Sequence, residues 1–330
     1  MSLKQIAQEL GLSLTTVSRA LNDYPEVSAK TKKKVKEVAQ RLDYIPNPIA
    51  RGLALGKANA VGIVFPATVN DLGDVNYLKV LSAMSERFAQ ERIDLFIISA
   101  SSENELASYE RIIHGGRVDA FIVPRTKVHD VRLDYLQQKK IPFVAHGRSD
   151  GCHQPYAWFD MDNAYGAKLA ALHFMDLNCK RIAYFCADIA YNFIHQRYNA
   201  FQQTLSQASD IQLDTYHSGL EQSRGYLAAQ EMLDSPQRPD AIFIDNHAAA
   251  FGVLLALSEA GLKIQKDIQV IVYGMLSDTA IALTKGISTI QIPQQINAGH
   301  ELADLMLKVL HQEDIHTLQV LHRPVLVTGS

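Results

Sequence analysis

Three short amphipathic segments occupy the first 42 residues of the chain. The segment from Leu3 to Leu10 carries apolar residues at helical spacing, and Gly11 breaks the pattern. A second helix is predicted from Leu14, and a third from Ala29 to about Leu42, each with one apolar face. Two short helices joined by a glycine-containing turn predict a helix-turn-helix.

The second helix, in the stretch SLTTVSRALN at 13–22, has an unusual distribution of side chains. Ser13 is suited to cap it, and Val17 and Leu21 give it one narrow apolar side. Its other sides carry short hydrogen-bonding groups and one guanidinium: Thr15, Thr16, Ser18 and Arg19. Such a helix fits the major groove of DNA, where it reads base edges. An ordinary three-helix bundle that does not bind DNA is the alternative.

Charge is distributed unevenly between this head and the rest of the chain. Residues 1–57 hold ten Lys and Arg against five Asp and Glu, a balance of +5, whereas the remainder has a balance of −8. The lysines of the third helix are suited to contact phosphates: Lys30, Lys32, Lys33, Lys34 and Lys36. The asymmetry predicts that only the head binds a polyanion, with a merely solvated charged face as the alternative.

Residues 44–57, YIPNPIARGLALGK, contain two prolines and two glycines and predict a linker. Its small apolar residues permit a short helix that is unstable alone. We expect this helix to form only when it pairs with a second copy on DNA.

From Ala60 the pattern changes to alternating strands and helices. Apolar runs predict strands at 60–65, 95–99, 120–124, 143–146, 181–185, 215–217, 241–244 and 268–273. Helical segments separate them, among others at 77–90, 103–113, 163–176, 194–205, 222–233 and 247–259. Repeated βα units predict an α/β fold with two doubly wound parallel sheets.

Several classes of protein lack support in the sequence. No apolar run reaches the roughly 18 residues of a membrane span, and no secretory signal is found, so we expect a cytoplasmic protein without a membrane partner. The three cysteines lack metal-ligand spacing, and the glycine-rich nucleotide-binding motifs are missing, so no metal or cofactor is expected. No nucleophile–base pair or paired carboxylates indicate an enzyme.

The head resembles the DNA-binding domain of the lactose/galactose/purine repressor family. The matching pieces are LKQIAQELGLS, TTVSRALN, VSAKTKKKV and YIPNPIARGLA, in the family's order. The resemblance implies DNA contacts from Lys4, Leu14, Thr15, Thr16, Ser18, Arg19, Asn22, Ser28, Lys30 and Thr31, with Leu14 contributing to operator choice. It also implies a minor-groove hinge helix at about 47–54, in which Asn47 and Ala50 contact DNA and Leu53 is wedged between base pairs.

The body resembles the same family's two-lobed fold, which is similar to periplasmic sugar-binding proteins. The matching pieces are HGR at 146–148, DMDNAYGA at 160–167, KRIAYF at 180–185, RYNAF at 197–201, DNHAAAFG at 245–252 and ISTIQIP at 287–293. The resemblance implies three crossings between lobes, near 158–160, 286–290 and 316–319. We therefore expect a DNA-binding domain at 1–45, a linker at 46–57 and an effector-binding and dimerisation domain at 58–330, with an N-lobe at 60–158 and 290–317 and a C-lobe at 159–289 and 318–330.

Ligands of doubly wound sheets bind beyond the carboxyl ends of the strands. The candidates there and at the crossings are Arg125, His146, Arg148, Phe159, Tyr191, Arg197, Asn246, His247, Tyr273 and Gln291. The resemblance marks Arg197 and Asn246 as effector-binding residues, and the donors of an arginine can clamp two hydroxyls or a carboxylate. Trp158 and Phe159 are candidates to stack on a sugar. Structural roles are the alternative for His146, His247 and Trp158, and a surface charge for Arg197.

Two departures from the family's pattern bear on the ligand. Most relatives have Gly-Phe/Tyr-Asp where this chain has Val272, Tyr273 and Gly274, and His247 replaces an Asp that commonly follows Asn246. Two carboxylates are lost and several arginines lie nearby, so the sequence does not identify which monosaccharide binds. The Arg-Thr pair at 125–126 and HGR at 146–148 look most like members that respond to plant-type or α-linked glycosides. We expect a sugar or glycoside, with an anionic sugar derivative as the alternative.

The resemblance implies a transcriptional regulator, a repressor of carbohydrate-utilisation genes that binds a near-palindromic operator as a homodimer. Ligand binding would close the lobes and unpair the hinge helices, while a corepressor would act with the opposite sign. A regulator with a non-sugar effector is the alternative. A sugar-binding transport protein is a remote one, because such a protein needs a signal peptide and carries no helix-turn-helix.

Overall fold

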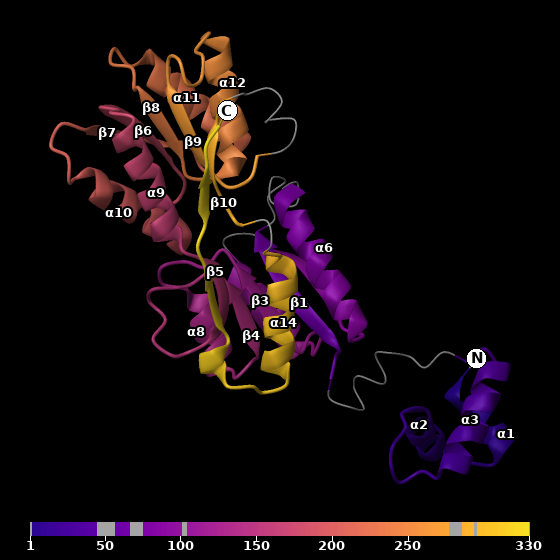
Figure 1. Ribbon diagram of the computed structural model, residues 1–330. Helices are drawn as coiled ribbons and strands as arrows, with labels where there is room; N and C mark the ends of the chain where they lie inside the picture. Colours follow the sequence, from indigo (N-terminus) through magenta and orange to yellow (C-terminus); the bar gives the residue numbers. More distant parts are fainter. Residues whose placement is uncertain are drawn as a thin grey trace. The chain divides into compact units, whose positions relative to one another are not determined.

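A computed structural model describes residues 2–44, 57–66, 75–100, 104–276, 286–293 and 296–329 (Figure 1). The chain divides into a small unit, the head, which contains the residues up to Asn59, and a large unit, the body, which holds most residues from Ala60 onward. The predicted hinge helix at 47–54, with Asn47, Ala50 and Leu53, lies outside the described residues.

The head consists of three helices at the predicted positions: α1 (Leu3–Leu10), α2 (Leu14–Leu21) and α3 (Ala29–Arg41). Ser13 caps α2, since its Oγ accepts a hydrogen bond from the Thr16 N–H at 3.0 Å, and Ser28 caps α3 in the same way. A small core joins apolar side chains of all three helices: Ile6, Ala7, Val17, Ala20, Val35, Val38 and Ala39. Because isolated helices this short are unstable in water, the shared core holds the head together.

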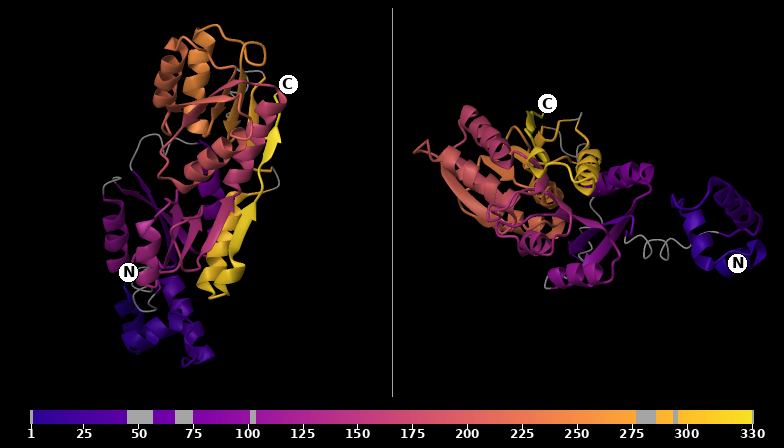
Figure 2. Two further views of the ribbon diagram at one scale, coloured as in Figure 1. Left: turned by 90° about the vertical axis from the view of Figure 1, so that its left-hand side faces the viewer. Right: turned by 90° about the horizontal axis from the view of Figure 1, so that it is seen from below.

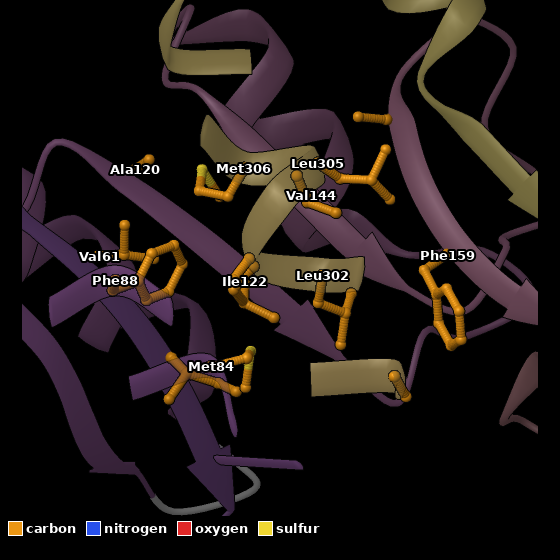
Figure 3. Packing of buried hydrophobic residues seen from close by; sticks show 14 of the residues in the cluster. Val61, Met84, Phe88, Ala120, Ile122, Val144, Phe159, Leu302, Leu305 and Met306 are labelled. Carbon is orange, nitrogen blue, oxygen red and sulfur yellow. The ribbon is translucent and has the colours of Figure 1, made fainter. Parts of the chain in front are cut away.

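The first lobe of the body is built on a six-stranded parallel sheet. Its order is β11 (Gln319–His322), β5 (Ala157–Met161), β4 (Phe143–His146), β3 (Ala120–Pro124), β1 (Ala60–Pro66), β2 (Asp94–Ala100). One face is covered by α6 (Val75–Gln90) and α14 (Ala298–Leu310), and the lobe also contains α7 (Glu105–His114), α8 (Val131–Gln138) and the 3-10 helix η1 (Ile315–Thr317). Figure 3 shows the core beneath α6 and α14, where Met84, Phe88, Leu302 and Met306 pack on Ile122 of the sheet.

The second lobe repeats this plan with one antiparallel strand. Its sheet order is β12 (Val325–Val327), β10 (Ser288–Gln291), β9 (Gln269–Tyr273), β8 (Ala241–Ile244), β6 (Arg181–Cys186), β7 (Gln212–His217), and β12 runs antiparallel to β10. The helices α9 (Asn163–Asp176) and α10 (Asn192–Leu205) cover one core, and α11 (Gln222–Asp234) and α12 (His247–Glu259) cover the other. No helix among the described residues is long and apolar enough to cross a membrane.

The predicted α/β fold with two doubly wound sheets is confirmed, but the predicted crossings are a few residues too early. The stretch 158–160 lies inside β5, 286–290 overlaps β10, and 316–319 reaches into β11. The chain instead changes lobes after Met161, after Gln291 and after His322, and the last step joins β11 to β12 (yellow in Figures 1 and 2). Of these strands, β11 and β12 lie at sheet edges and are half exposed, which weakens their apolar signal.

A buried ion cluster ties α8 to the end of β3. The Arg132 guanidinium donates to both carboxylate oxygens of Asp130, at 2.9 and 2.7 Å, and to the carboxylate of Glu105 on α7. Its Nη2 also donates to the main-chain carbonyls of Pro124 and Arg125 at 3.0 Å. All three charged side chains are buried. One side chain therefore holds the loop after β3 from inside the lobe.

We predict that Arg132→Met lowers the free energy of unfolding by about 3–5 kcal/mol, because it leaves Asp130 and Glu105 buried without their partner. Urea unfolding followed by circular dichroism measures the change. The matched control is Arg111→Met on the exposed side of α7, with an expected effect within about 0.5 kcal/mol. Equal unfolding of the two variants would contradict a structural role for the cluster.

Candidate functional site

In the head, α2 separates buried from exposed side chains as the sequence predicts. Val17 and Ala20 are completely buried, whereas Leu14 is 49% exposed and Thr15 and Arg19 are also exposed. The Arg19 guanidinium lies 3.5 Å from the Glu26 carboxylate, and both side chains are half exposed. An exposed ion pair of this kind contributes little stability, so it is easily exchanged for another anion.

Two of the five lysines in α3 are bound to the turn that precedes it. Lys32 Nζ donates to the main-chain carbonyl of Asp23 at 2.9 Å, and Lys36 Nζ donates to its carboxylate at 2.7 and 2.8 Å. Asp23 has a φ of +58°, a backbone conformation that residues other than glycine adopt at a cost in free energy. Lys32 and Lys36 therefore stabilise the turn between α2 and α3, and contact of the five lysines with phosphates stays a prediction.

The other DNA-contact candidates in the described part of the head lie at or near its surface. Lys4, Ser28 and Lys30 are exposed, and Thr16, Ser18, Asn22 and Thr31 are half-buried. Several of them already support the fold: the Asn22 amide donates to the Ser18 carbonyl at 2.9 Å, and the hydroxyls of Ser28 and Thr31 lie 2.8 Å apart.

In the body, Arg197 on α10 contacts α9, the loop after β8, the end of β9 and a neighbouring residue of its own helix. Its Nε donates to Asn163 Oδ1 at 2.9 Å, and its Nη1 donates to the main-chain carbonyl of Asp245 at 2.5 Å. The guanidinium carbon lies 3.4 Å from the centroid of the Tyr273 ring and 4.9 Å from that of Phe193. Arg197 and Tyr273 are thus brought together at the end of β9, as predicted.

Behind Arg197, the end of β8 carries a buried carboxylate. Burial raises the pKa of Asp245 to about 6, although the Asn246 amide and the charge of Arg197 act in the opposite direction. Asn246 caps α12: its Oδ1 accepts from the Ala249 N–H at 2.9 Å, and its Nδ2 donates to the Gly219 carbonyl and to Asp245. In this structure Asn246 is therefore a capping residue.

On the first-lobe side, His146 and Phe159 belong to a row of rings. His146 lies between Tyr77 and Phe159, with centroid distances of 6.0 and 5.8 Å, and burial lowers the pKa of His146 to about 4. The imidazole is therefore neutral near pH 7. Phe159 has no exposed surface and belongs to the core of the first lobe (Figure 3). The expectation that Phe159 stacks on a ligand is corrected, because its position in β5 turns the ring inward.

Two of the three candidate arginines of the body, Arg148 and Arg197, are joined by hydrogen bonds that pass from one lobe to the other. Arg148 Nε donates to Asp160 Oδ2 at 2.8 Å, and Asp160 Oδ1 accepts from Asn163 Nδ2 at 3.1 Å. Asn163 in turn accepts from Arg197, and Arg148 Nη2 donates to Gln196 Oε1 at 3.3 Å. Because Gln196 and Arg197 are consecutive, these five residues close a ring, which we call the interlobe ring. Sequence reasoning did not identify Asp160, Asn163 or Gln196 as site residues.

The remaining candidates lie at strand ends or in the loops beside them. Arg125, at the end of β3, has a φ of +51° and a half-buried side chain. The ring of Tyr191 is stacked with that of Phe193 at 5.8 Å. Gln291 Nε2 donates to Thr289 Oγ1 at 2.6 Å on β10.

His247 and Gly274, the two positions that depart from the family's pattern, are neighbours in space. Gly274 has a φ of +110°, and a Cβ built on it would lie 2.9 Å from His247 Nδ1 and 3.2 Å from His247 Cβ. The imidazole therefore occupies the space that a side chain at 274 would need.

A three-helix head with a polar reading helix, joined to a two-lobed α/β body, is the architecture of a ligand-controlled DNA-binding protein. Residues 2–47 match the model of bacterial regulatory proteins of the lacI family, and residues 58–324 match that of periplasmic binding proteins and the sugar-binding domain of the LacI family. The chain belongs to the LacI family of transcriptional regulators, as the sequence predicts.

Individual relatives agree with this assignment. The chain is 31% identical over 332 residues to the HTH-type transcriptional regulator RafR of Escherichia coli, which covers 100% of this chain and 98% of RafR. It is 34% identical over 275 residues to AglR of Rhizobium meliloti (strain 1021), covering 82% and 77%. A putative transcriptional regulator from Yersinia pestis superposes with a TM-score of 0.73 at 31% identity, covering 83% of this chain and 98% of that one. The lac repressor dimer bound to operator and anti-inducer has the same fold, with a TM-score of 0.81 at 21% identity, covering 100% and 98%. These relatives are regulators and not enzymes.

We predict that Asp245 makes stability fall as pH rises from about 4 to about 6. Its pKa is higher in the folded chain than in the unfolded one, so the folded state favours the protonated carboxyl and loses that advantage as the carboxyl ionises. Relative to Asp245→Asn, the free energy of unfolding of the wild type should decrease by roughly 3 kcal/mol across this range. Urea unfolding at pH 4 to 7 measures it, with the exposed Asp234→Asn as control. Parallel curves for wild type and Asp245→Asn would refute the assignment.

Proposed function

We propose that the protein is a sugar-responsive repressor that binds its operator as a homodimer and takes a sugar or glycoside between its lobes. The observation that carries the proposal is the combination, in one chain, of a helix with exposed reading residues and a body matched to a sugar-binding domain. Names of relatives support it: one solved structure of this fold is a CelR–cellobiose complex, with a TM-score of 0.71 at 20% identity. A role in carbohydrate utilisation follows from the same relatives.

The DNA-binding half of the proposal places α2 in the major groove. Leu14, Thr15 and Arg19 project from the side of α2 away from the core, so they are placed to meet base edges, while Lys4 and Lys30 are exposed for phosphates. The homodimer is supported by β2, an edge strand whose Phe96 and Ile97 are each 48% exposed. An edge strand with exposed large apolar side chains is normally covered by another surface.

We predict that Arg19→Ala weakens operator binding at least about tenfold, because a base or phosphate contact from arginine is lost. The operator is recovered by selection from random duplexes with the wild-type protein, and binding is followed by fluorescence anisotropy. Arg238→Ala, an exposed arginine of the body, is the control and should bind as the wild type does. If the selected duplexes contain one half-site and not a near-palindrome of two, the homodimer is contradicted. If no sequence is selected, the DNA-binding proposal is contradicted.

The effector half of the proposal places the ligand against Arg197. Arg197 lies on the aromatic rings of Phe193 and Tyr273, and such rings offer a face to the C–H groups of a sugar while the guanidinium donates to hydroxyls. An anionic sugar derivative is the second candidate. It is favoured by the presence of Arg148 and Arg197 in one ring of side chains, where the single carboxylate belongs to Asp160.

We predict that a neutral sugar or glycoside produces a saturable change in the fluorescence of Trp158, the only tryptophan of the chain. The Arg148 guanidinium lies 5.4 Å from the Trp158 ring and also bonds to Gln196 of the other lobe, so movement of the lobes alters the environment of the indole. The probes are melibiose, sucrose, maltose, cellobiose, glucuronate and glucose 6-phosphate. Arg197→Met should abolish the response and Arg238→Met should retain it.

A response to glucuronate or glucose 6-phosphate alone would favour the anionic alternative. No response in fluorescence and no rise in the unfolding temperature with any probe would contradict the sugar proposal, since a ligand that binds the folded state raises that temperature.

A further inference from the structure

We infer that Gln196 is the positioning residue through which the state of the cleft at Arg197 is passed to the first lobe, an inference that rests on the proposed function. Gln196 precedes Arg197 on α10, and the two side chains bond to different lobes. Arg197 bonds to Asn163 and Asp245 of the second lobe, whereas Gln196 bonds to the first.

The Gln196 amide bridges two oppositely charged groups of the first lobe. Its Nε2 donates to Asp150 Oδ1 at 3.2 Å, and its Oε1 accepts from Arg148 Nη2 at 3.3 Å. An amide is the side chain that can satisfy an acceptor and a donor at once without carrying a charge. A carboxylate here would repel Asp150, and an ammonium would repel Arg148.

The first turn of α10 makes further contacts beside this amide. Asn192 Nδ2 donates to Asp150 Oδ1 at 3.1 Å and to the Arg148 carbonyl at 2.9 Å. Two main-chain hydrogen bonds also join the lobes: the Asn192 N–H donates to the Thr126 carbonyl at 2.9 Å, and the Val128 N–H to the Ala190 carbonyl at 3.0 Å. The start of α10 therefore contacts the first lobe through both main chain and side chains.

On the first-lobe side, the contact with α10 is made by loops that hydrogen bonds hold in place. Asp150 and Arg148 follow β4, and Arg148 is held by Asp160. Thr126 lies in the loop after β3, which the buried Arg132 holds by its carbonyls. A ligand that shifts Arg197 together with α10 therefore moves Gln196 against a partner that its own lobe holds. The interlobe ring offers the second connection between the same two residues, through Asn163, Asp160 and Arg148.

The test uses the full-length protein without ligand or DNA. Hydrogen exchange is measured at the amides of Val128 and Asn192, whose hydrogen bonds cross between the lobes. Gln196→Ala should accelerate exchange at both amides about tenfold, because the side-chain bonds beside them are lost. The matched control is Gln203→Ala, the same residue type two turns further along α10 and exposed, which should leave both rates unchanged.

A double-mutant cycle then tests the transmission itself. Arg197→Lys should accelerate exchange at Val128 several-fold in the wild type and less than about twofold when Gln196→Ala is already present. Unchanged exchange in Gln196→Ala, or equal effects of Arg197→Lys in both backgrounds, would overturn the inference. Arg197→Gln serves as the second perturbation of Arg197 if Arg197→Lys fails to fold. Because no sugar or operator is used, a failure here is distinguishable from a failure of the proposed function.

Discussion

The arrangement of the body depends on the hydrogen bonds that join its two lobes, because these bonds must hold the lobes together and still permit them to move. Side-chain hydrogen bonds join the lobes at α9 and α10. Each of those described pairs a side-chain amide of the second lobe with a charged group or a main-chain carbonyl of the first lobe. Asn163 meets Asp160, while Asn192 and Gln196 meet Asp150 and Arg148. The buried charge of Asp160 keeps its partner, Arg148, inside its own lobe. Exposing an amide to water on opening costs far less than separating a buried ion pair. The contact surface is therefore suited to two states that differ by a few kcal/mol, the range in which a ligand can shift a population.

In the head, stability and recognition are assigned to different side chains. The core takes the apolar face of α2, and the turn behind it is held by Lys32 and Lys36 on Asp23. Folding therefore does not depend on the exposed residues of α2, so these residues can differ between regulators that bind different operators. The charge of +5 in residues 1–57 already counts the carboxylate of Asp23, so its pairing with Lys36 determines where the positive field lies and leaves the net charge unchanged.

The elements whose limits the sequence predicts best are buried segments with alanine-rich or continuous apolar runs. The predicted limits of α9 and α12 coincide with the structure, and the predicted strands 120–124, 143–146 and 241–244 coincide with β3, β4 and β8. The strands β5, β10 and β11, after which the chain changes lobes, have no predicted counterpart, and β11 lies at a sheet edge where half of its side chains meet solvent. Their absence from the prediction displaced the lobe boundaries by a few residues.

The candidate site was predictable only in part. Arg197 could be identified by the motif around it, but its partners Asn163 and Asp245 are distant in sequence, and no periodicity indicates which side chain a guanidinium will meet. Asn246 did carry a local signal that its effector assignment overlooked. An asparagine directly before a helix is a favoured N-cap, and its amide oxygen binds the Ala249 N–H. Asp160 was visible as a carboxylate, but alternation along β5 does not reveal that Arg148 neutralises it.

The two departures from the family's pattern are one structural change. An aspartate at 274 would require a Cβ at a φ of +110°, and that Cβ would lie within 3.2 Å of both the ring and the Cβ of His247. A carboxylate at 274 therefore needs a different side chain at 247, and His247 in turn needs glycine at 274. An aspartate at 247 is accessible by the single substitution His247→Asp, whereas an aspartate at 274 requires changes at both positions. Arg197, held on the face of Tyr273, and the imidazole of His247 lie near this end of the sheet. The ligand that we propose for Arg197 is therefore one whose groups accept hydrogen bonds from a guanidinium, which sugar hydroxyls and carboxylates both do.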